Sequence, residues 1–146
     1  MLALFMASEV IVEEALDALD PNALLAKLPI DACGAIVSFI GITRGIDDGK
    51  QVYRLEFDAW QSKLNPTLRR LGEEAIEKFG IEHAALAHRT GSVGPAEPIV
   101  AIHVSSKHRK EAFEACSWLI DELKKQAPIW KKEVREDGEE WKAGLG

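Results

Sequence analysis

The order of the expected strands and helices constrains the fold of this chain more than any other feature. Apolar and β-branched runs predict strands over residues 1–7, 34–41, 52–60, 81–89 and 98–105. Apolar residues at helical spacing predict helices over residues 13–19, 21–28, 65–79 and 107–126. Because hairpin signals stand beside helices, this order favours an α+β fold with a mixed or antiparallel sheet and packed helices over a doubly wound sheet.

Several of these segments carry more specific expectations. The run 34–41 is almost continuously apolar, which is typical of a strand buried on both faces, and residues 41–49 predict a loop. Polar and apolar side chains alternate over residues 52–60, which predicts a strand with one face exposed to solvent. The helix over 65–79 is expected to begin at Asn65-Pro66 and to end at Gly80. The expected core residues of the last strand and the last helix are Val100, Ile102, Val104, Ala112, Phe113, Cys116, Leu119, Ile120 and Leu123.

Length, charge and cysteine content limit the class of protein. A chain of 146 residues fits one domain, residues 1–146. A net charge of −6 argues against a broad nucleic-acid-binding surface. The run 1–7 is too short to cross a membrane and lacks the flanks of a signal peptide. Cys33 and Cys116 stand far apart in no paired spacing, so the sequence predicts a cytoplasmic protein without a metal site or a cofactor.

Basic residues concentrate between residues 107 and 132, which is locally about +3 in an acidic chain. Lys107, His108, Arg109 and Lys110 occupy the expected first turn of the last helix, where the helix dipole disfavours cations. Such a cluster indicates an anion-binding site at the helix N-terminus. The alternative is a solvated turn that water and salt screen.

The other end of this helix offers groups for catalysis. Lys124 follows Leu123 at the edge of the expected buried face, where partial desolvation and a second ammonium would lower its pKa. Lys131 follows in the extended stretch after Pro128. Lys125 and Lys132 are better interpreted as part of a positively charged helix end, where their side chains satisfy carbonyl groups, than as functional residues. Arg44 in its glycine-flanked loop could close over a phosphate.

Histidine and cysteine add little to this picture. His103 is expected on the outward side of its strand as an ordinary surface residue, and His83 and His88 show no metal-ligand spacing. Cys116 lies on the apolar stripe and Cys33 has no basic neighbour, so neither indicates a nucleophile. An enzymatic interpretation must therefore rest on lysine, arginine and histidine.

Four segments resemble the MoaE family, the large catalytic subunits of molybdopterin synthase. The similar segments are residues 34–44, 88–95, 105–115 and 123–133. The resemblance implies the α/β-hammerhead fold of that family and the transfer of two sulfurs to cyclic pyranopterin monophosphate, which forms the dithiolene of molybdopterin. It also implies a small ubiquitin-like partner that brings the sulfur as a thiocarboxylate on its C-terminal Gly-Gly, and a homodimer within a heterotetramer.

The resemblance also implies roles for individual residues. Lys124 and Lys131 match the family's two essential lysines, for proton transfer and charge stabilisation. The residues implied to hold the cyclic phosphate are Arg44, His108 and Arg109, and those implied to line the substrate are Ile42, Thr43, Lys132 and Glu133. The acidic loop 45–49 departs from the family pattern.

Helix length predicts how these residues assemble. Arg109 and Lys124 are fifteen positions apart, about 22 Å along one helix, too far for both to hold one small ligand. We therefore expect a two-fold dimer in which His108 and Arg109 of one subunit complete the pocket of the other. Two rivals use the same residues: a non-catalytic α+β module that binds a small anionic metabolite and regulates a partner, and a structural dimer with a solvated basic face.

Overall fold

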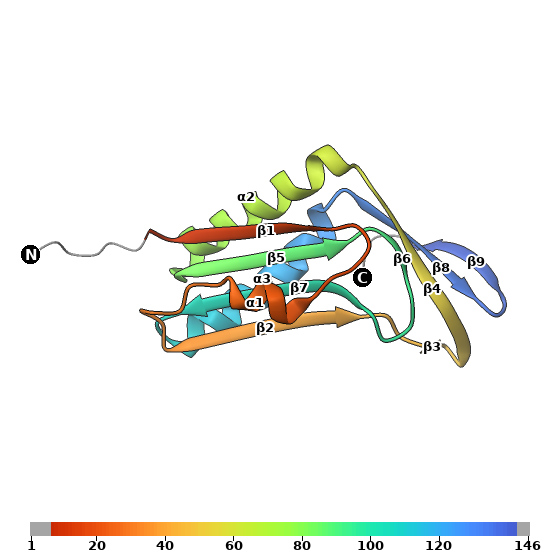
Figure 1. Ribbon diagram of the computed structural model, residues 1–146, viewed down its shortest axis with the longest axis horizontal. Coiled ribbons are helices and arrows are strands. Elements are labelled where there is room, and N and C mark those ends of the chain that lie inside the picture. Colours follow the sequence, from red (N-terminus) through yellow and green to blue (C-terminus); the bar gives the residue numbers. More distant parts are fainter. Residues whose placement is uncertain (1–6, 143–146) are drawn as a thin grey trace, which may run out of the picture.

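The computed structural model describes residues 7–142, which form two β-sheets and three helices (Figure 1). The strands are β1 (Glu9–Ala15), β2 (Ala35–Ile42), β3 (Ile46–Asp47), β4 (Lys50–Ala59), β5 (His83–Arg89), β6 (Gly91–Val93), β7 (Pro98–Ser106), β8 (Ile129–Arg135) and β9 (Gly138–Lys142). The helices are α1 (Pro21–Ala26), α2 (Gln61–Phe79) and α3 (Arg109–Gln126). The predicted α+β class with a mixed sheet is confirmed.

The first sheet has the strand order β1-β5-β7-β2. β1 runs parallel to β5, and the other neighbours are antiparallel. The second sheet has the order β3-β4-β8-β9, with β6 also paired to β4, and it extends from one end of the first sheet (Figure 1).

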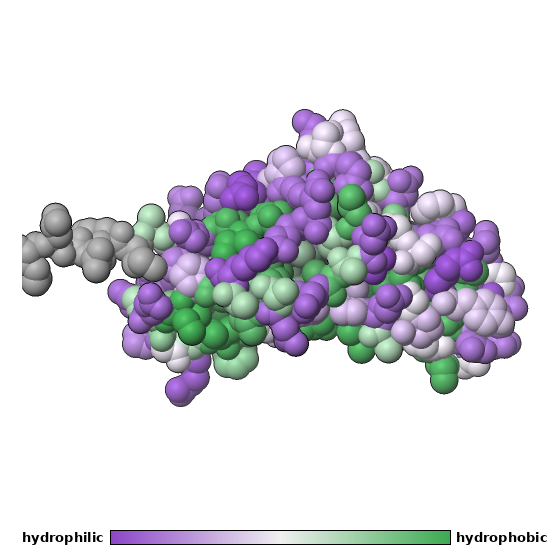
Figure 2. Space-filling view, in the orientation of Figure 1, coloured by the Kyte–Doolittle hydropathy of each residue, from purple (hydrophilic) through white to green (hydrophobic). Residues whose placement is uncertain are grey.

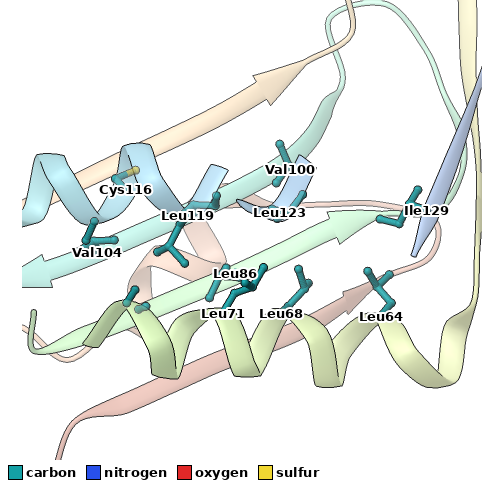
Figure 3. Packing of buried hydrophobic residues seen from close by; sticks show 14 of the residues in the cluster. Leu64, Leu68, Leu71, Leu86, Val100, Val104, Cys116, Leu119, Leu123 and Ile129 are labelled. Carbon is teal, nitrogen blue, oxygen red and sulfur yellow. The ribbon is translucent and has the colours of Figure 1, made fainter. Parts of the chain in front are cut away.

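Helices cover both faces of the first sheet. α2 and α3 pack on one face, where Leu71, Leu86 and Leu119 are fully buried and meet in the main core (Figure 3). Burial of each such side chain contributes about 1.5–3 kcal/mol to stability. α1 lies on the other face, where Leu24 packs against the alanines of β5 and β7. The predicted core residues of α3 include one error: Phe113 is exposed, because its side chain projects from the helix away from the sheet.

The helix predicted over residues 13–19 is wrong, because β1 continues through Ala15. Its residues pair with β5, from Glu9 opposite His83 to Ala15 opposite Arg89, and this long-range pairing overrides the local helical pattern. The strand predicted over residues 1–7 lies almost wholly outside the described residues.

Two more local predictions are corrected. α2 begins at Gln61 rather than at Asn65, because buried Leu64 continues the apolar stripe one turn before Leu68, and Pro66 lies inside the helix. Residues 45–52 form a hairpin rather than a loop: β3 pairs with β4 around Asp48 and Gly49, both at positive φ. Gly80 ends α2 in the left-handed conformation, as predicted.

β2 is an edge strand, and only one of its faces is buried, so the prediction of two buried faces is wrong. Its side chains alternate: Phe39 packs against the core, whereas Ile36 and Ile40 are exposed. Figure 2 shows apolar residues on the molecular surface in the region of β2. The reason is that α1 covers the central strands and does not reach over this edge.

Candidate active site

A cavity of about 440 Å³ opens where the two sheets meet the C-terminal end of α3. Its apolar wall combines side chains from both sheets and from α3, including Phe39, Leu55, Phe57, Ile120 and Leu123. Its titratable or charged lining residues are Arg44, Asp47, His88, Lys124, Lys131 and Glu133. The cavity therefore joins a hydrophobic wall to a polar cluster with three basic and two acidic side chains besides His88.

Helix α3 and strand β8 bring the two predicted lysines to this cavity. Leu123 is buried in the core, so the next residue, Lys124, emerges at the cavity edge. Beyond Pro128 the chain enters β8, where Lys131 lies opposite Phe57 and Glu133 lies opposite Leu55. Because alternate strand residues share a face, Lys131 and Glu133 both face the cavity.

The environment of Lys131 lowers its pKa. Burial is the main cause, and the positive charges of Arg44, Lys124 and Lys142 act in the same direction. The carboxylate of Glu133 opposes them and raises the pKa. An amine whose charged form is disfavoured in this way can exchange a proton with a bound reactant more readily than a solvated lysine can.

Glu133 is itself unusual, because a glutamate side chain is only 5% exposed here. Its Oε2 lies 3.5 Å from Nζ of Lys142 on β9. Its Oε1 is buried and has no hydrogen-bond partner within residues 7–142. A buried carboxylate oxygen of this kind is costly unless a guest in the cavity supplies a donor.

His88 lines the cavity, although the sequence analysis gave it no role. It is buried at the end of β5, and its ring meets the Phe57 ring edge to face at 5.2 Å. Nδ1 donates to the Arg89 carbonyl at 2.7 Å, which leaves Nε2 as an acceptor. Burial lowers the pKa of His88 to about 4, so the ring is neutral at pH 7. The sequence offered one sign of a role for His88: it lies at the end of a predicted strand, within a segment that resembles the MoaE family.

Other predicted site residues lie away from the cavity of their own chain. Lys132 points to the opposite face of β8, where its Nζ lies 2.9 Å from Glu56 Oε2 and 5.7 Å from the Trp141 ring centroid. Thr43 is buried, and its backbone is hydrogen-bonded to Ala96 and Glu97. It does not line the cavity, whereas its neighbours Ile42 and Arg44 do.

His108 and Arg109 lie at the other end of α3 from Lys124. The backbone N–H of His108 donates to Glu111 Oε1 at 2.7 Å, so a carboxylate of the same turn already satisfies one group at this N-terminus. Ser106 Oγ donates to the same oxygen at 3.1 Å. Glu111 thus offsets part of the unfavourable charge that the basic cluster places on the helix dipole.

His103 is a correction to the sequence analysis, because it is buried and not on an outward surface. Its Nε2 donates to the Pro21 carbonyl at 2.8 Å, and Nδ1 lies 2.6 Å from the Ser38 hydroxyl, which donates to it. Burial lowers the pKa of His103, and the bond to Pro21 partly opposes this. His103 therefore joins β7 to α1 and β2 as a neutral structural residue.

Cys116 and the grouping of possible metal ligands were the other features to consider in the described part of the chain. Burial raises the pKa of the Cys116 thiol to about 11, so it is a poor nucleophile, in agreement with the sequence analysis. Within residues 7–142, no three His, Cys, Asp or Glu side chains are grouped so that they could hold a metal ion. None of the described helices is long and apolar enough to cross a membrane.

Comparisons with known proteins agree on one family. The family described as "MoaE protein" matches residues 11–126. The molybdopterin synthase catalytic subunit of Pyrococcus abyssi is 38% identical over 120 residues, which cover 82% of this chain and 81% of that protein. The corresponding subunit of Bacillus subtilis is 42% identical over 118 residues, covering 81% and 75%.

Solved structures extend the likeness to the fold. The crystal structure of molybdopterin synthase from Staphylococcus aureus superposes with a TM-score of 0.83 at 32% identity, covering 90% of this chain and 96% of that chain. A complex of subunits 1 and 2 of the molybdopterin-converting factor from Helicobacter pylori matches with a TM-score of 0.70 at 26% identity, covering 89% and 88%.

Proposed function

The chain belongs to the MoaE protein family, and from this premise we propose that it is the catalytic subunit of a molybdopterin synthase. It transfers two sulfurs to cyclic pyranopterin monophosphate and so forms the dithiolene of molybdopterin. The observation that carries the proposal is the convergence of Arg44, Lys124, Lys131 and Glu133 on one cavity with an apolar wall. We place this activity in the cytoplasm and in a single domain, residues 1–146.

The sulfur reaches this cavity on a partner protein. Cys116 is buried in the core with a raised pKa, and neither it nor Cys33 lines the cavity, so this chain offers no thiol for sulfur transfer. The family resemblance implies that a small ubiquitin-like subunit supplies the sulfur as a C-terminal thiocarboxylate, and the lack of a thiol in the cavity agrees with this. The Helicobacter pylori complex of two subunits supports an assembly of this kind.

Lys131 and Lys124 carry the chemical step in this proposal. Lys131, whose pKa is lowered, and Lys124 transfer protons during the attack of sulfur on the substrate carbons. Both amines also stabilise the negative charge that develops on the attacked carbons and on the thiocarboxylate. Ile42 lines the substrate beside Arg44, whereas Thr43 and Lys132 support the site from behind the cavity wall.

A second copy of the chain completes the phosphate side of the cavity. His108 and Arg109 lie at the opposite end of α3 from Lys124, so they cannot serve the cavity of their own chain. In a two-fold dimer they would reach the cavity of the partner subunit. A mixed dimer of Lys124→Ala and Arg109→Ala chains would keep one intact site, and activity no higher than that of either parent would contradict this arrangement.

The direct test combines the purified chain, a thiocarboxylated small subunit and the pyranopterin precursor, with the dithiolene product detected by mass. Lys131→Ala and Lys124→Arg should each abolish product, because a guanidinium cannot release a proton at neutral pH. Lys125→Ala is the matched control, since Lys125 is exposed and pairs with Glu122 at 3.5 Å. Full activity of Lys124→Arg would instead favour a module that only binds an anion.

A further inference from the structure

Ser38 and His103 form a hydrogen-bonded pair on the first sheet, away from the cavity that holds Lys124 and Lys131. The two residues lie directly opposite each other on β2 and β7, and Ser38 Oγ is 2.6 Å from His103 Nδ1. The other ring nitrogen, Nε2, lies 2.8 Å from the carbonyl oxygen of Pro21 on α1. Neither Ser38 nor His103 lines the cavity, so the pair is a separate feature of the molecule.

The two hydrogen bonds of the His103 ring fix which atom carries each proton. A carbonyl oxygen only accepts, so Nε2 holds the ring hydrogen and donates it to Pro21. Burial lowers the pKa of His103, which keeps the ring neutral at pH 7 and leaves Nδ1 as an acceptor. The Ser38 hydroxyl therefore donates to Nδ1, and a base is in place to receive its proton.

This arrangement has the three parts of an activated nucleophile: a hydroxyl, a base, and a group that orients the base. His103 is 2% exposed, and hydrogen bonds hold both of its ring nitrogens. Ser38 is exposed, so a reactant can reach its Oγ. Ser105 shows the contrast, because it is fully buried and donates to the Pro29 carbonyl at 2.9 Å, as a structural serine does. An exposed hydroxyl bonded to a buried imidazole is suited to attack an electrophile.

The surroundings of Ser38 limit the kind of electrophile. Ile36 and Ile40 lie two residues before and after it in β2, and their side chains are 44% and 37% exposed. Because alternate strand residues share a face, both stand beside the hydroxyl, where they offer contact to an apolar group. β2 is an edge strand, and no described strand pairs with its outer edge, so alternate backbone N–H groups there are available to a developing oxyanion. These features fit the carbonyl of an ester with a small apolar acyl group.

We propose that Ser38 is a nucleophile, activated by His103, that accepts the acyl group of small apolar esters and passes it to water. Ser38 Oγ bonds to the ester carbonyl carbon while His103 Nδ1 takes the hydroxyl proton. The bond from that carbon to the leaving oxygen then breaks, and the alcohol departs with the proton from His103. Water attacks the acyl-serine with the same base, which releases the acid and restores the hydroxyl. This hydrolysis goes beyond the proposed sulfur transfer and uses neither Lys124 nor Lys131.

The first test is covalent labelling of the purified full chain with diisopropyl fluorophosphate. This probe transfers its phosphoryl group to an activated hydroxyl with loss of fluoride, and peptide mass mapping identifies the labelled residue. The unaltered protein should be labelled at Ser38, and Ser38→Ala should lose that label. Ser92→Ala is the matched control and should keep the label at Ser38, because Ser92 is an exposed serine of β6 that lies opposite Glu56 and not opposite a histidine.

The second test asks whether His103 supplies the activation and whether the ester is turned over. His103→Gln should slow the labelling of Ser38 by about a hundredfold, since it removes the base. Unfolding in urea separates the same pair without a substitution and should slow labelling equally. With p-nitrophenyl acetate, the unaltered protein should release p-nitrophenolate over many turnovers, whereas Ser38→Ala should show only the slow reaction of lysines. No label at Ser38, equal labelling of folded and unfolded chains, or ester release that Ser38→Ala does not reduce would each overturn the proposal.

Discussion

His88 makes the stability of this protein depend on pH, and a single substitution removes that dependence. The ring is buried, and burial lowers its pKa from 6.5 to about 4, helped by the charge of Lys131 and opposed by the bond to the Arg89 carbonyl. The folded protein therefore keeps His88 neutral at pH values where the unfolded chain protonates it. Above pH 6.5 His88 is neutral in both the folded and the unfolded state, so its titration does not change the free energy of unfolding.

The size of the effect follows from the two pKa values. Between pH 6.5 and pH 4 the unfolded chain binds the extra proton, so the free energy of unfolding decreases as the pH falls. Each pKa unit is worth about 1.4 kcal/mol, which gives about 3 kcal/mol over the full window and about 2.5 kcal/mol by about pH 4.5. Below pH 4 both states are protonated and the loss stops growing.

The assay is urea unfolding followed by tryptophan fluorescence at about pH 7 and about pH 4.5, for the unaltered protein and His88→Asn. The asparagine amide can replace Nδ1 as donor to the Arg89 carbonyl. Asparagine is smaller, so the substitution adds a destabilising offset that does not depend on pH, and this offset cancels in the difference between the two pH values. The contributions of other groups, including His103, cancel in the same way.

The unaltered protein should lose about 2.5 kcal/mol more than the variant between the two pH values. The dependence of unfolding on urea must keep the same slope, so that the comparison reports stability and not a change in the unfolded ensemble. Parallel losses in the two proteins would refute the reasoning, because they would show that folding does not keep His88 neutral.

Two further predictions concern packing and charge. Gly72→Ala should destabilise the protein by about 1 kcal/mol in urea unfolding, because a Cβ would lie 2.6 Å from Val10 Cγ1 and overpacking outweighs the helical preference of alanine; a more stable variant would contradict this. In an NMR titration of ¹³C-labelled lysines, Glu133→Gln should lower the pKa of Lys131 further and Lys124→Gln should raise it, since the two charges act on that amine in opposite directions. No shift in either variant would show that burial alone controls the pKa of Lys131.

The sequence predicted correctly those helix ends and strand faces that depend on residues close by in the chain. Gly80 ends α2 because its conformation requires a residue that adopts positive φ readily. Val104 faces the main core as predicted, although β7 is buried on both faces and not on one. β1 was missed since it is stabilised by pairing with β5, more than seventy residues away, as in Glu9 opposite His83.

The candidate site was predicted in part. Lys124, Lys131 and Arg44 share the cavity that the sequence analysis expected of them, because their local chemistry and the family resemblance point the same way. His88 and Asp47 were missed. The first needed the burial that both sheets provide, and the second needed the hairpin that turns its carboxylate inward.

Strand β8 separates what each level of structure decides. The sequence by itself determined that Lys131 and Glu133 share one face of an extended segment while Trp130 and Lys132 share the other, because alternation is a property of the local backbone. Only the tertiary structure decided which face is the cavity wall. Pairing of Lys131 with Phe57 turns one face toward the cavity that α3 also lines and turns Lys132 on the other face toward Glu56. Such contacts join residues far apart in the chain.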